Sequence, residues 1–173
     1  MSGVISAKKA DKGIRLDFPR NDPAEVETPR EIMKALGLSS WREVIYSKDT
    51  GNLLVILEDY AEVQAVAPDF IRLSSAENEL GVKGIIVTAE SSRKYDFVSR
   101  YFAPWVDINK DPVTGSAHTV LTPYWADKLR KSNLLAYQAS ERGGDLSVEL
   151  KENRLYVSGS AVTVIEGHLN LPA

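Results

Sequence analysis

The sequence contains no cysteine and only two histidines, His118 and His168. Without cysteine the chain has no disulfide, no thiolate metal site and no cysteine nucleophile. The two histidines stand far apart in the sequence, and no metal-ligand spacing surrounds either of them. We therefore expect that the protein binds no metal ion.

The chain also lacks three kinds of long segment. No apolar run reaches membrane-spanning length, no signal-peptide pattern opens the sequence, and no long basic run occurs. The formal net charge is −3, which makes nucleic acid and anionic membranes poor partners. These features are compatible with the cytosol, so we expect a cytoplasmic protein that binds neither nucleic acid nor membrane.

What the sequence does contain is typical of one folded domain. Its 173 residues are 43% hydrophobic and 26% charged, which suffices for one well-buried core. Apolar residues alternate with polar ones between glycine-rich and proline-rich turns, which predicts many short strands and few helices. The predicted strands are 4–19 (two strands), 43–47, 53–58, 84–89, 97–102, 134–139, 146–150, 154–157 and 161–166, and the predicted helices are 28–36, 61–66 and 115–129.

The helix predicted at 115–129 is far more apolar than the others. Its apolar residues recur at spacings of three and four, which places them on one helix face; they are Ala117, Val120, Leu121, Tyr124, Trp125 and Leu129. Pro123 lies inside this helix and is expected to kink it. Because strands precede and follow the helix, we expect an α+β fold in which a mostly antiparallel β-barrel curls around it.

Residues at the start of this helix are suited to binding an anion. Thr114, Gly115 and Ser116 have short side chains, and the first N–H groups of a helix have no partner inside it. We call this group of residues the anion seat, and Asp111 places a carboxylate beside it. A site of this kind can hold a small carboxylic acid at the seat while the acid–base group moves a proton on it. The alternative is a capped core helix preceded by a turn at Asp111 and Pro112.

Several motifs resemble those of the PhzF-like (phenazine biosynthesis-like) isomerases, which share the diaminopimelate epimerase fold. DPVTGSAH at 111–118, PYWADKL at 123–129 and YQASERGGDLSV at 137–148 resemble the second half of that family, and LDFP at 16–19 and RYFAP at 100–104 also match. The resemblance runs over essentially the whole chain but covers only the later part of the family's pattern. It implies a protein of two similar lobes, each a mostly antiparallel barrel around a central helix, with the active site between them.

The resemblance also implies an activity, which is acid–base proton transfer on a small carboxylic acid without cofactor or metal. It implies that Asp111 contacts the substrate and acts as the catalytic residue of this chain. Thr114, Gly115 and Ser116 match positions that bind substrate. Lys110 departs from the family, which commonly has an acidic residue there, and its charge would lower the pKa of Asp111 if the two side chains came close.

His118 lies within the same motif and should point along the core, so we predict a partly buried histidine with satisfied hydrogen bonds and not a catalytic one. A nucleophile pair of Ser116 and His118 is excluded on two grounds. Val113 stands where the nucleophile elbow of a hydrolase needs glycine. Residues two apart on a helix also do not face each other.

An internal repeat indicates which part of the family's pattern is present. The stretch 2–7 resembles 143–148, and each opens a glycine-led hairpin of the same length. The second hairpin closes the lobe built on the apolar helix, so the first would close an earlier lobe. We therefore expect residues 1–20 to be the closing hairpin of a truncated N-terminal lobe and residues 21–173 to be the C-terminal lobe.

In the family the earlier lobe carries the glutamate regarded as the proton-shuttling residue, and this sequence shows no counterpart of it. One hypothesis is therefore the C-terminal part of a PhzF-like isomerase, inactive alone unless a partner supplies the missing lobe. The alternative is a non-catalytic half-enzyme that acts as an interaction or small-anion-binding protein. Such a half-enzyme would expose apolar surface and would be prone to form a homodimer.

Overall fold

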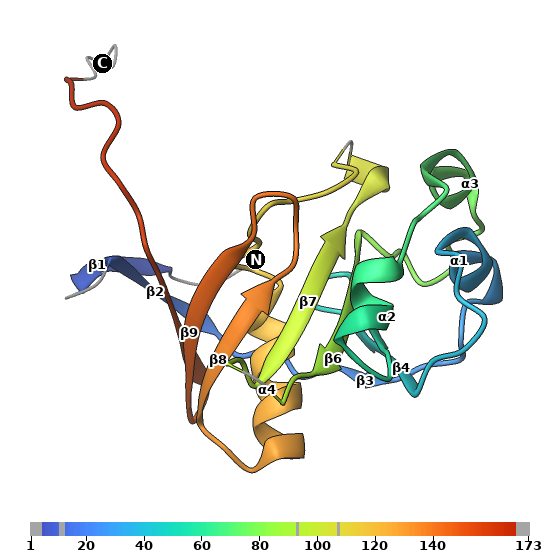
Figure 1. Ribbon diagram of the computed structural model, residues 1–173, viewed down its shortest axis with the longest axis horizontal. Helices are drawn as coiled ribbons and strands as arrows, with labels where there is room; N and C mark the ends of the chain where they lie inside the picture. The colour runs from blue at the N-terminus through green and yellow to red at the C-terminus, as the bar shows by residue number, and fades with distance from the viewer. Residues whose placement is uncertain (1–4, 11–12, 93, 107, 169–173) are drawn as a thin grey trace.

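The computed structural model describes residues 5–10, 13–92, 94–106 and 108–168. Within these ranges the chain forms one sheet of ten strands, four α-helices and a short 3-10 helix (Figure 1). The strands are β1 (Ser6–Ala10), β2 (Gly13–Pro19), β3 (Ala24–Glu25), β4 (Glu43–Ser47), β5 (Asn52–Ile56), β6 (Gly84–Glu90), β7 (Phe97–Phe102), β8 (Asn133–Gln138), β9 (Gly144–Lys151) and β10 (Arg154–Gly159). The helices are α1 (Arg30–Ala35), α2 (Tyr60–Ala65), α3 (Phe70–Ser75), η1 (Pro104–Val106) and α4 (His118–Leu129).

The sheet is mixed and open, so the predicted closed barrel is not found among the described strands. The strand order is β1-β2-β10-β9-β8-β7-β6-β5-β4-β3. Among the described strand pairs, only β5–β6 and β7–β8 are parallel. Within the described residues the two end strands, β1 and β3, each pair on one side, and β3 is just two residues long. The sheet therefore has two free edges, whereas a barrel pairs its first strand with its last.

The helix α4 nevertheless packs against one face of this sheet. Its buried side chains share one core cluster with residues from every strand between β4 and β10. Four members of the cluster come from α4 and are buried, namely Val120, Leu121, Trp125 and Ala126, and Ala117 joins them from the residue just before the helix. The most apolar helix therefore packs against the strands that precede and follow it in the sequence, but the predicted barrel around it is not confirmed.

Pro123 lies inside α4 and lacks the N–H group that would bond the carbonyl of Thr119 four residues earlier. The backbone N–H of Asn21 donates to that carbonyl instead, at 3.2 Å. A buried carbonyl without a partner is costly, so this bond offsets the loss that proline causes. The segment that follows β2 is thereby tied to the first turn of the central helix.

The opposite face of the sheet is covered by α1, α2 and α3, which form a second core cluster with β4 to β7. Consecutive residues of β5 alternate between the two clusters. Leu53 and Val55 belong to the cluster with α1–α3, and Leu54 and Ile56 belong to the cluster with α4. This alternation follows from the period of two in a strand, and it explains why β5 is buried along its whole length.

Two sequence predictions are corrected by the structure. The helix predicted from Gly115 begins at His118, because residues 115–117 form a turn that leads into it. The segment 161–166 was predicted as a strand, but it pairs with no described strand and extends away from the sheet (Figure 1). Alternating β-branched residues favour a strand only where a neighbouring edge is available to pair with them.

The predicted division between residues 1–20 and 21–173 stays a prediction. Strand β2 pairs with β10, with Leu16 opposite Val157, so both parts contribute to one sheet. Within the described part of the chain, no helix is long and apolar enough to cross a membrane.

Candidate functional site

The candidate site is built on the loop that joins β7 to α4. This loop brings Asp111 and Thr114 together, since the Thr114 hydroxyl donates to Asp111 Oδ2 at 2.7 Å. The backbone N–H of Asp111 donates to the carbonyl of Tyr101 at 3.4 Å, which anchors the loop to the end of β7. Thr114 is buried and Asp111 is half-buried. One oxygen of the Asp111 carboxylate is therefore fixed by Thr114.

Gln138, at the end of β8, holds this loop in place. Its Oε1 accepts from the Thr114 backbone N–H at 2.8 Å, and its Nε2 donates to the Asp111 carbonyl at 2.8 Å. Nε2 also lies 3.1 Å from Thr114 Oγ1. Gln138 is 1% exposed, so these bonds form away from competing water. The sequence analysis missed this residue.

The turn at 115–117 leaves a run of free backbone donors in front of α4. The N–H groups of His118 and Thr119 already donate to the carbonyls of Gly115 and Ser116, at 3.2 and 3.1 Å. Among the described residues, none accepts a hydrogen bond from the N–H groups of Gly115, Ser116 or Ala117. Three successive N–H groups of this kind at the positive end of a helix are suited to an anion, and we call them the candidate anion seat.

Gly115 is not required by the packing of the described chain. A Cβ atom placed there would lie 3.7 Å from Phe18 and 4.0 Å from Leu16, which is ordinary contact. These two residues belong to β2, so the N-terminal hairpin forms one wall of the anion seat. Position 115 therefore has room for the methyl group of alanine.

Asp111 also lines a cavity of about 390 Å³ between α2, β7 and the loop after β8. Cavities of this size accept small molecules. The wall combines aromatic rings with charged groups: Tyr60, Tyr101, Phe102, Tyr137, Arg100, Lys110, Asp111 and Glu141. Of the four site residues predicted from the sequence, Asp111 alone lines this cavity. Thr114 is buried, and Gly115 and Ser116 lie in the turn before α4.

Tyr101, Arg100 and Lys110 in the cavity wall differ in their contacts. Burial, together with the negative charge of Asp111, raises the pKa of Tyr101, so its hydroxyl stays protonated and donates to Asn52 Oδ1 at 3.3 Å. Arg100 donates to three carbonyls at the end of α2, at 2.7 to 3.0 Å. No described ion pair joins Lys110 to the Asp111 carboxylate, although both residues line the cavity.

His118 is a core histidine, but it is more deeply buried than predicted and only one of its ring nitrogens has a described partner. It is fully buried, and Nδ1 lies 2.9 Å from the carbonyl of Thr114, which can only accept. Nδ1 therefore carries the proton and Nε2 is an acceptor, for which no described residue supplies a donor. Burial lowers the pKa of His118 to about 4, because the charged form would lose its hydration. The ring is neutral near pH 7 and holds the loop through Thr114.

Two glycines allow the loop and β9 to approach each other closely. A Cβ atom at Gly144 would lie 2.3 Å from Val113 Cγ2, and one at Gly143 would lie 2.3 Å from the hydroxyl of Tyr137. Gly143 also has φ +68, a conformation that side chains disfavour. The glycine pair that opens the second predicted hairpin therefore also packs against the candidate site.

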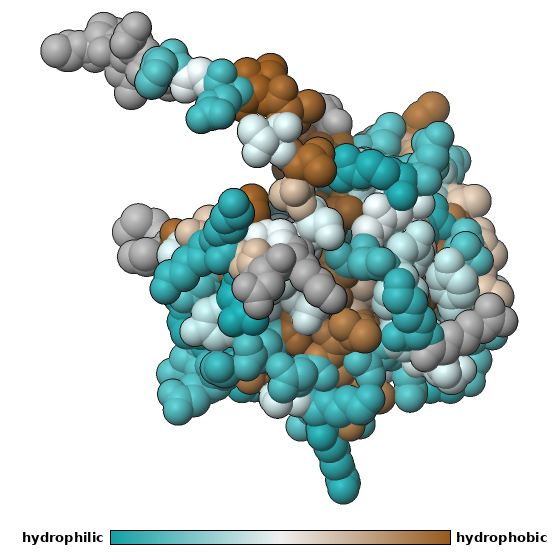
Figure 2. All heavy atoms as spheres, turned by 60° about the vertical axis from the view of Figure 1, so that its left-hand side comes forward, coloured by the Kyte–Doolittle hydropathy of each residue, from teal (hydrophilic) through white to brown (hydrophobic). Residues whose placement is uncertain are grey.

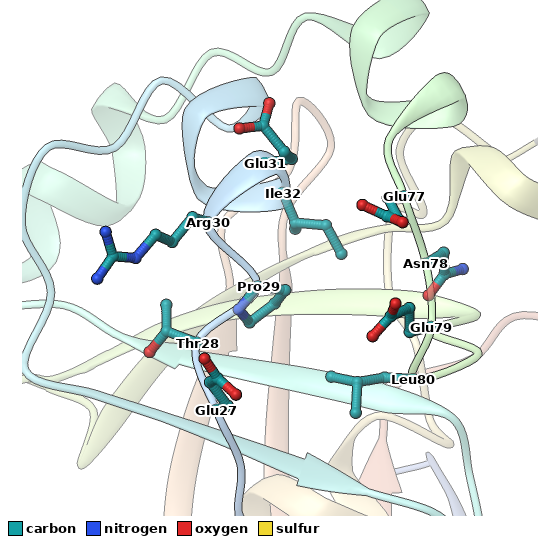
Figure 3. A pocket seen from close by; sticks show the side chains of 10 residues that line it. All are labelled: Glu27, Thr28, Pro29, Arg30, Glu31, Ile32, Glu77, Asn78, Glu79 and Leu80. Carbon is teal, nitrogen blue, oxygen red and sulfur yellow. The ribbon is translucent and has the colours of Figure 1, made fainter.

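A second hollow, of about 410 Å³, lies between the segment before α1 and the segment after α3. The carboxylates of Glu27, Glu77 and Glu79 stand around it, while Arg30 extends to one side (Figure 3). None of the residues predicted from the sequence lines this hollow. Among the described residues, no three His, Asp or Glu side chains cluster closely enough to hold a metal ion.

Comparison with known proteins assigns the family. Residues 4–167 match the phenazine biosynthesis-like protein family. An uncharacterized isomerase of Halalkalibacterium halodurans is 40% identical over 172 residues, which are 98% of this chain and 62% of the relative. A phenazine biosynthesis-like domain-containing protein of mouse is 41% identical over 98% of this chain and 63% of the relative. The chain belongs to the phenazine biosynthesis-like (PhzF) family.

Solved structures agree with this assignment. The chain superposes with a TM-score of 0.83 on a PhzF family protein of Enterococcus faecalis, at 38% identity over 95% of this chain and 60% of the other. A PhzC/PhzF protein of Clostridium difficile gives a TM-score of 0.80 at 35% identity. The chain spans about three fifths of the length of the relatives it matches.

Proposed function

We propose that this chain supplies the acid–base aspartate and the carboxylate seat of a PhzF-like isomerase that moves a proton on a small carboxylic acid. The observation that carries the proposal is the arrangement around Asp111. Its carboxylate lines a cavity, is fixed by Thr114, and stands four residues before the first of three free N–H groups that open α4.

The proposed step needs no change of oxidation state. A base takes a proton from a carbon of the substrate, the electron pair is delocalised toward the substrate, and an acid returns a proton to another position or face. Asp111 serves as the acid when protonated and as the base when ionised. The substrate carboxylate sits on the N–H groups of Gly115, Ser116 and Ala117, where the helix dipole stabilises negative charge.

Isomerisation by this route uses two acid–base groups, and Asp111 is one of them. We assign the second to a glutamate that the resemblance places outside the residues of this chain. The chain alone would then bind a carboxylate without turning it over. Glu141, which also lines the Asp111 cavity, is the one described glutamate that an experiment must exclude from this role.

The test is solvent-deuterium incorporation. The purified chain is incubated in D₂O with a panel of small carboxylic acids, and exchange at carbon is followed by proton NMR. We expect no exchange above the rate seen with heat-denatured protein. Exchange that is abolished by Asp111→Asn and kept by Glu141→Gln would support the chemistry of Asp111 but contradict the inactivity of the chain alone. Exchange that is unchanged in Asp111→Asn would contradict the proposal altogether.

A second function is favoured by one specific observation. The segment 161–165 exposes Val162, Val164 and Ile165, at 86%, 89% and 90%. Such residues are typical of surfaces that bind another protein. The alternative proposal is therefore a non-catalytic member of the family that acts through association or through binding of a small anion. This alternative would be favoured if the chain bound a carboxylate but catalysed no deuterium exchange, both alone and together with the proteins that associate with it.

A further inference from the structure

The cavity beside Asp111 lies where β7 and β8 separate. These two strands run parallel, and their pairing ends with Ser99 opposite Gln138. Beyond that point β7 continues through residues 100–102, which line one side of the cavity, while residues 139–141 line the other side. In open sheets the crevice outside the carboxyl ends of parallel strands is a common place for ligands. The topology of the sheet therefore provides the space for a bound molecule.

Arg100, in the wall of this cavity, uses only part of its guanidinium group for the fold. Its Nη1 donates to the carbonyls of Val63, Gln64 and Val66, at 3.0, 3.0 and 2.7 Å. A guanidinium group has five N–H donors, of which Nη1 carries two. Among the described residues, none accepts a hydrogen bond from Nε or Nη2. We call this side of the guanidinium group, with its three remaining donors, the free edge of Arg100.

Arg100 is also a half-buried cation without a described counter-ion. Burial lowers its pKa, whereas the pKa of Arg42, which faces the carboxylate of Glu58, is raised. The ring of Phe102 covers one face of the guanidinium group, with its centre 4.9 Å from Cζ. A charge removed from water without a partner is unfavourable. An oxyanion bound at the free edge would supply that partner through charge-assisted hydrogen bonds.

The other polar groups of the wall also favour an occupant that accepts hydrogen bonds. Lys110 adds a second positive charge and takes part in no described ion pair. The hydroxyl groups of Tyr60 and Tyr137 donate to no described residue. Asp111 and Glu141 are the two carboxylates of the wall. Glu141 is exposed, so water and salt screen its charge, while Arg100 is half-buried and screened less.

We propose that the free edge of Arg100, together with Lys110, binds a second oxyanion group of the ligand, either a carboxylate or a phosphate. The proposal rests on the proposed function, in which the first carboxylate lies at the candidate anion seat. Asp111 is common to both places, because its side chain lines the cavity and its loop leads into the seat at Gly115. A substrate fixed at both ends would hold its reacting carbon beside Asp111. The substrate class is therefore an acid with two oxyanion groups.

The first experiment compares acids that differ only in the second group. The purified chain is titrated calorimetrically, at constant ionic strength, with succinate, glutarate and adipate and with the monomethyl ester of each. We expect at least one diacid to bind at least about tenfold more tightly than its own ester. Each diacid binding no more tightly than its ester would overturn the proposal, and binding of the esters would still support the seat. A tighter fit of 3-phosphonopropionate than of glutarate would assign the second group as a phosphate.

Arg100→Lys separates binding from folding. A lysine ammonium group has three N–H donors, enough for the three carbonyls at the end of α2, and none is then left for a ligand. We expect the urea midpoint to be kept, and the preference for the diacid over its ester to fall by at least about fivefold. An unchanged preference would mean that Arg100 only holds α2, and this would contradict the proposal.

Lys110→Gln tests the same subsite at an exposed position, where the substitution leaves the fold intact. We expect the diacid to bind about threefold more weakly and the ester to be unaffected. Lys9→Gln is the matched control, since it removes the same charge from β1, which four strands separate from β7. Figure 2 turns this side of the molecule forward and shows many hydrophilic side chains on it. Equal weakening by both variants would mean that net charge alone attracts the diacid, and the proposal would be wrong.

Gly115→Ala distinguishes a failure of this proposal from a failure of the proposed function. The change lies at the candidate anion seat, so it should weaken the diacid and its ester alike. If it alters neither, the first carboxylate lies elsewhere and the proposed function is contradicted. The Arg100 and Lys110 variants still decide whether the second group is bound in the cavity, because their readout is the difference between the diacid and its ester.

Discussion

Gln138 and Thr114 exchange two hydrogen bonds across the base of the candidate site. The Thr114 N–H donates to Gln138 Oε1 at 2.8 Å, and Gln138 Nε2 donates to Thr114 Oγ1 at 3.1 Å. The same hydroxyl donates to Asp111. A buried amide on β8 therefore determines where the carboxylate stands, through a threonine 24 residues earlier in the chain.

Replacement of Gln138 by leucine should destabilise the protein and displace Asp111. The change leaves the Thr114 N–H and the Asp111 carbonyl without their partner in a buried place, which costs about 2–4 kcal/mol for two such groups. Gln64→Leu is the control, since the Gln64 side chain is exposed and should change the free energy of unfolding by less than about 0.5 kcal/mol. Urea unfolding measures both. Equal effects of the two substitutions would show that the Gln138 bonds contribute nothing.

Gly144→Ala should also disturb the loop. The new Cβ would lie 2.3 Å from Val113 Cγ2, so either β9 or the loop must move. We expect a loss of about 1–3 kcal/mol, as for overpacking in a core. Gly167→Ala, where no atom lies within 4 Å of the new Cβ, should be neutral. Thermal unfolding of the pair tests this, and a neutral Gly144→Ala would contradict the close packing.

The stability of the fold should depend on pH through His118. Its pKa is about 4 in the folded chain because of burial, against 6.5 for an ordinary histidine. As the pH falls through about 6.5, His118 binds a proton in the unfolded chain but stays neutral in the folded chain. The free energy of unfolding therefore falls by about 3 kcal/mol in total between about pH 6.5 and pH 4. Above pH 6.5 the contribution of His118 to this free energy is constant.

A series of urea titrations across that range checks the sign, and two variants assign it. His118→Gln should remove this fall in stability. His168→Gln should keep it, because His168 is exposed. A slope that survives in His118→Gln would mean that other groups cause the pH dependence.

Gly115→Ala separates ligand binding from folding. Since the new Cβ would make ordinary contact with Phe18, we expect the free energy of unfolding to stay within about 0.5 kcal/mol of wild type. The added methyl group lies at the anion seat, so binding of propionate should weaken by about tenfold or more. Calorimetric titration with propionate, beside a urea curve, measures both. Unchanged binding would place the carboxylate elsewhere.

The strands of the central sheet could be predicted because their signals are local. The runs at 84–90 and 97–102 are apolar, are bounded by turn residues and are buried in the sheet. Residues 161–166 carry an equally strong local signal but have no described partner edge, and a single sequence does not reveal whether one is present. The start of α4 was placed three residues early, since small residues suit a turn and a first helical turn alike.

The role of Gln138 was missed although one signal was available. In β8 the buried positions are Leu134, Ala136 and Gln138, so a polar amide ends an alternating series of core residues. A buried polar group in such a place must find hydrogen-bond partners. What no local pattern reveals is that those partners lie on the loop that carries Asp111, because that contact depends on the parallel pairing of β7 with β8.

The central claim is that the free N–H groups before α4 hold a carboxylate beside Asp111. The most direct measurement is a propionate titration of the ¹⁵N-labelled chain, with chloride at equal ionic strength as the control. The account predicts saturable shifts of the Gly115, Ser116 and Ala117 amide signals that chloride does not produce, and their loss in Gly115→Ala. Amide signals that stay unmoved while the protein remains folded would contradict it.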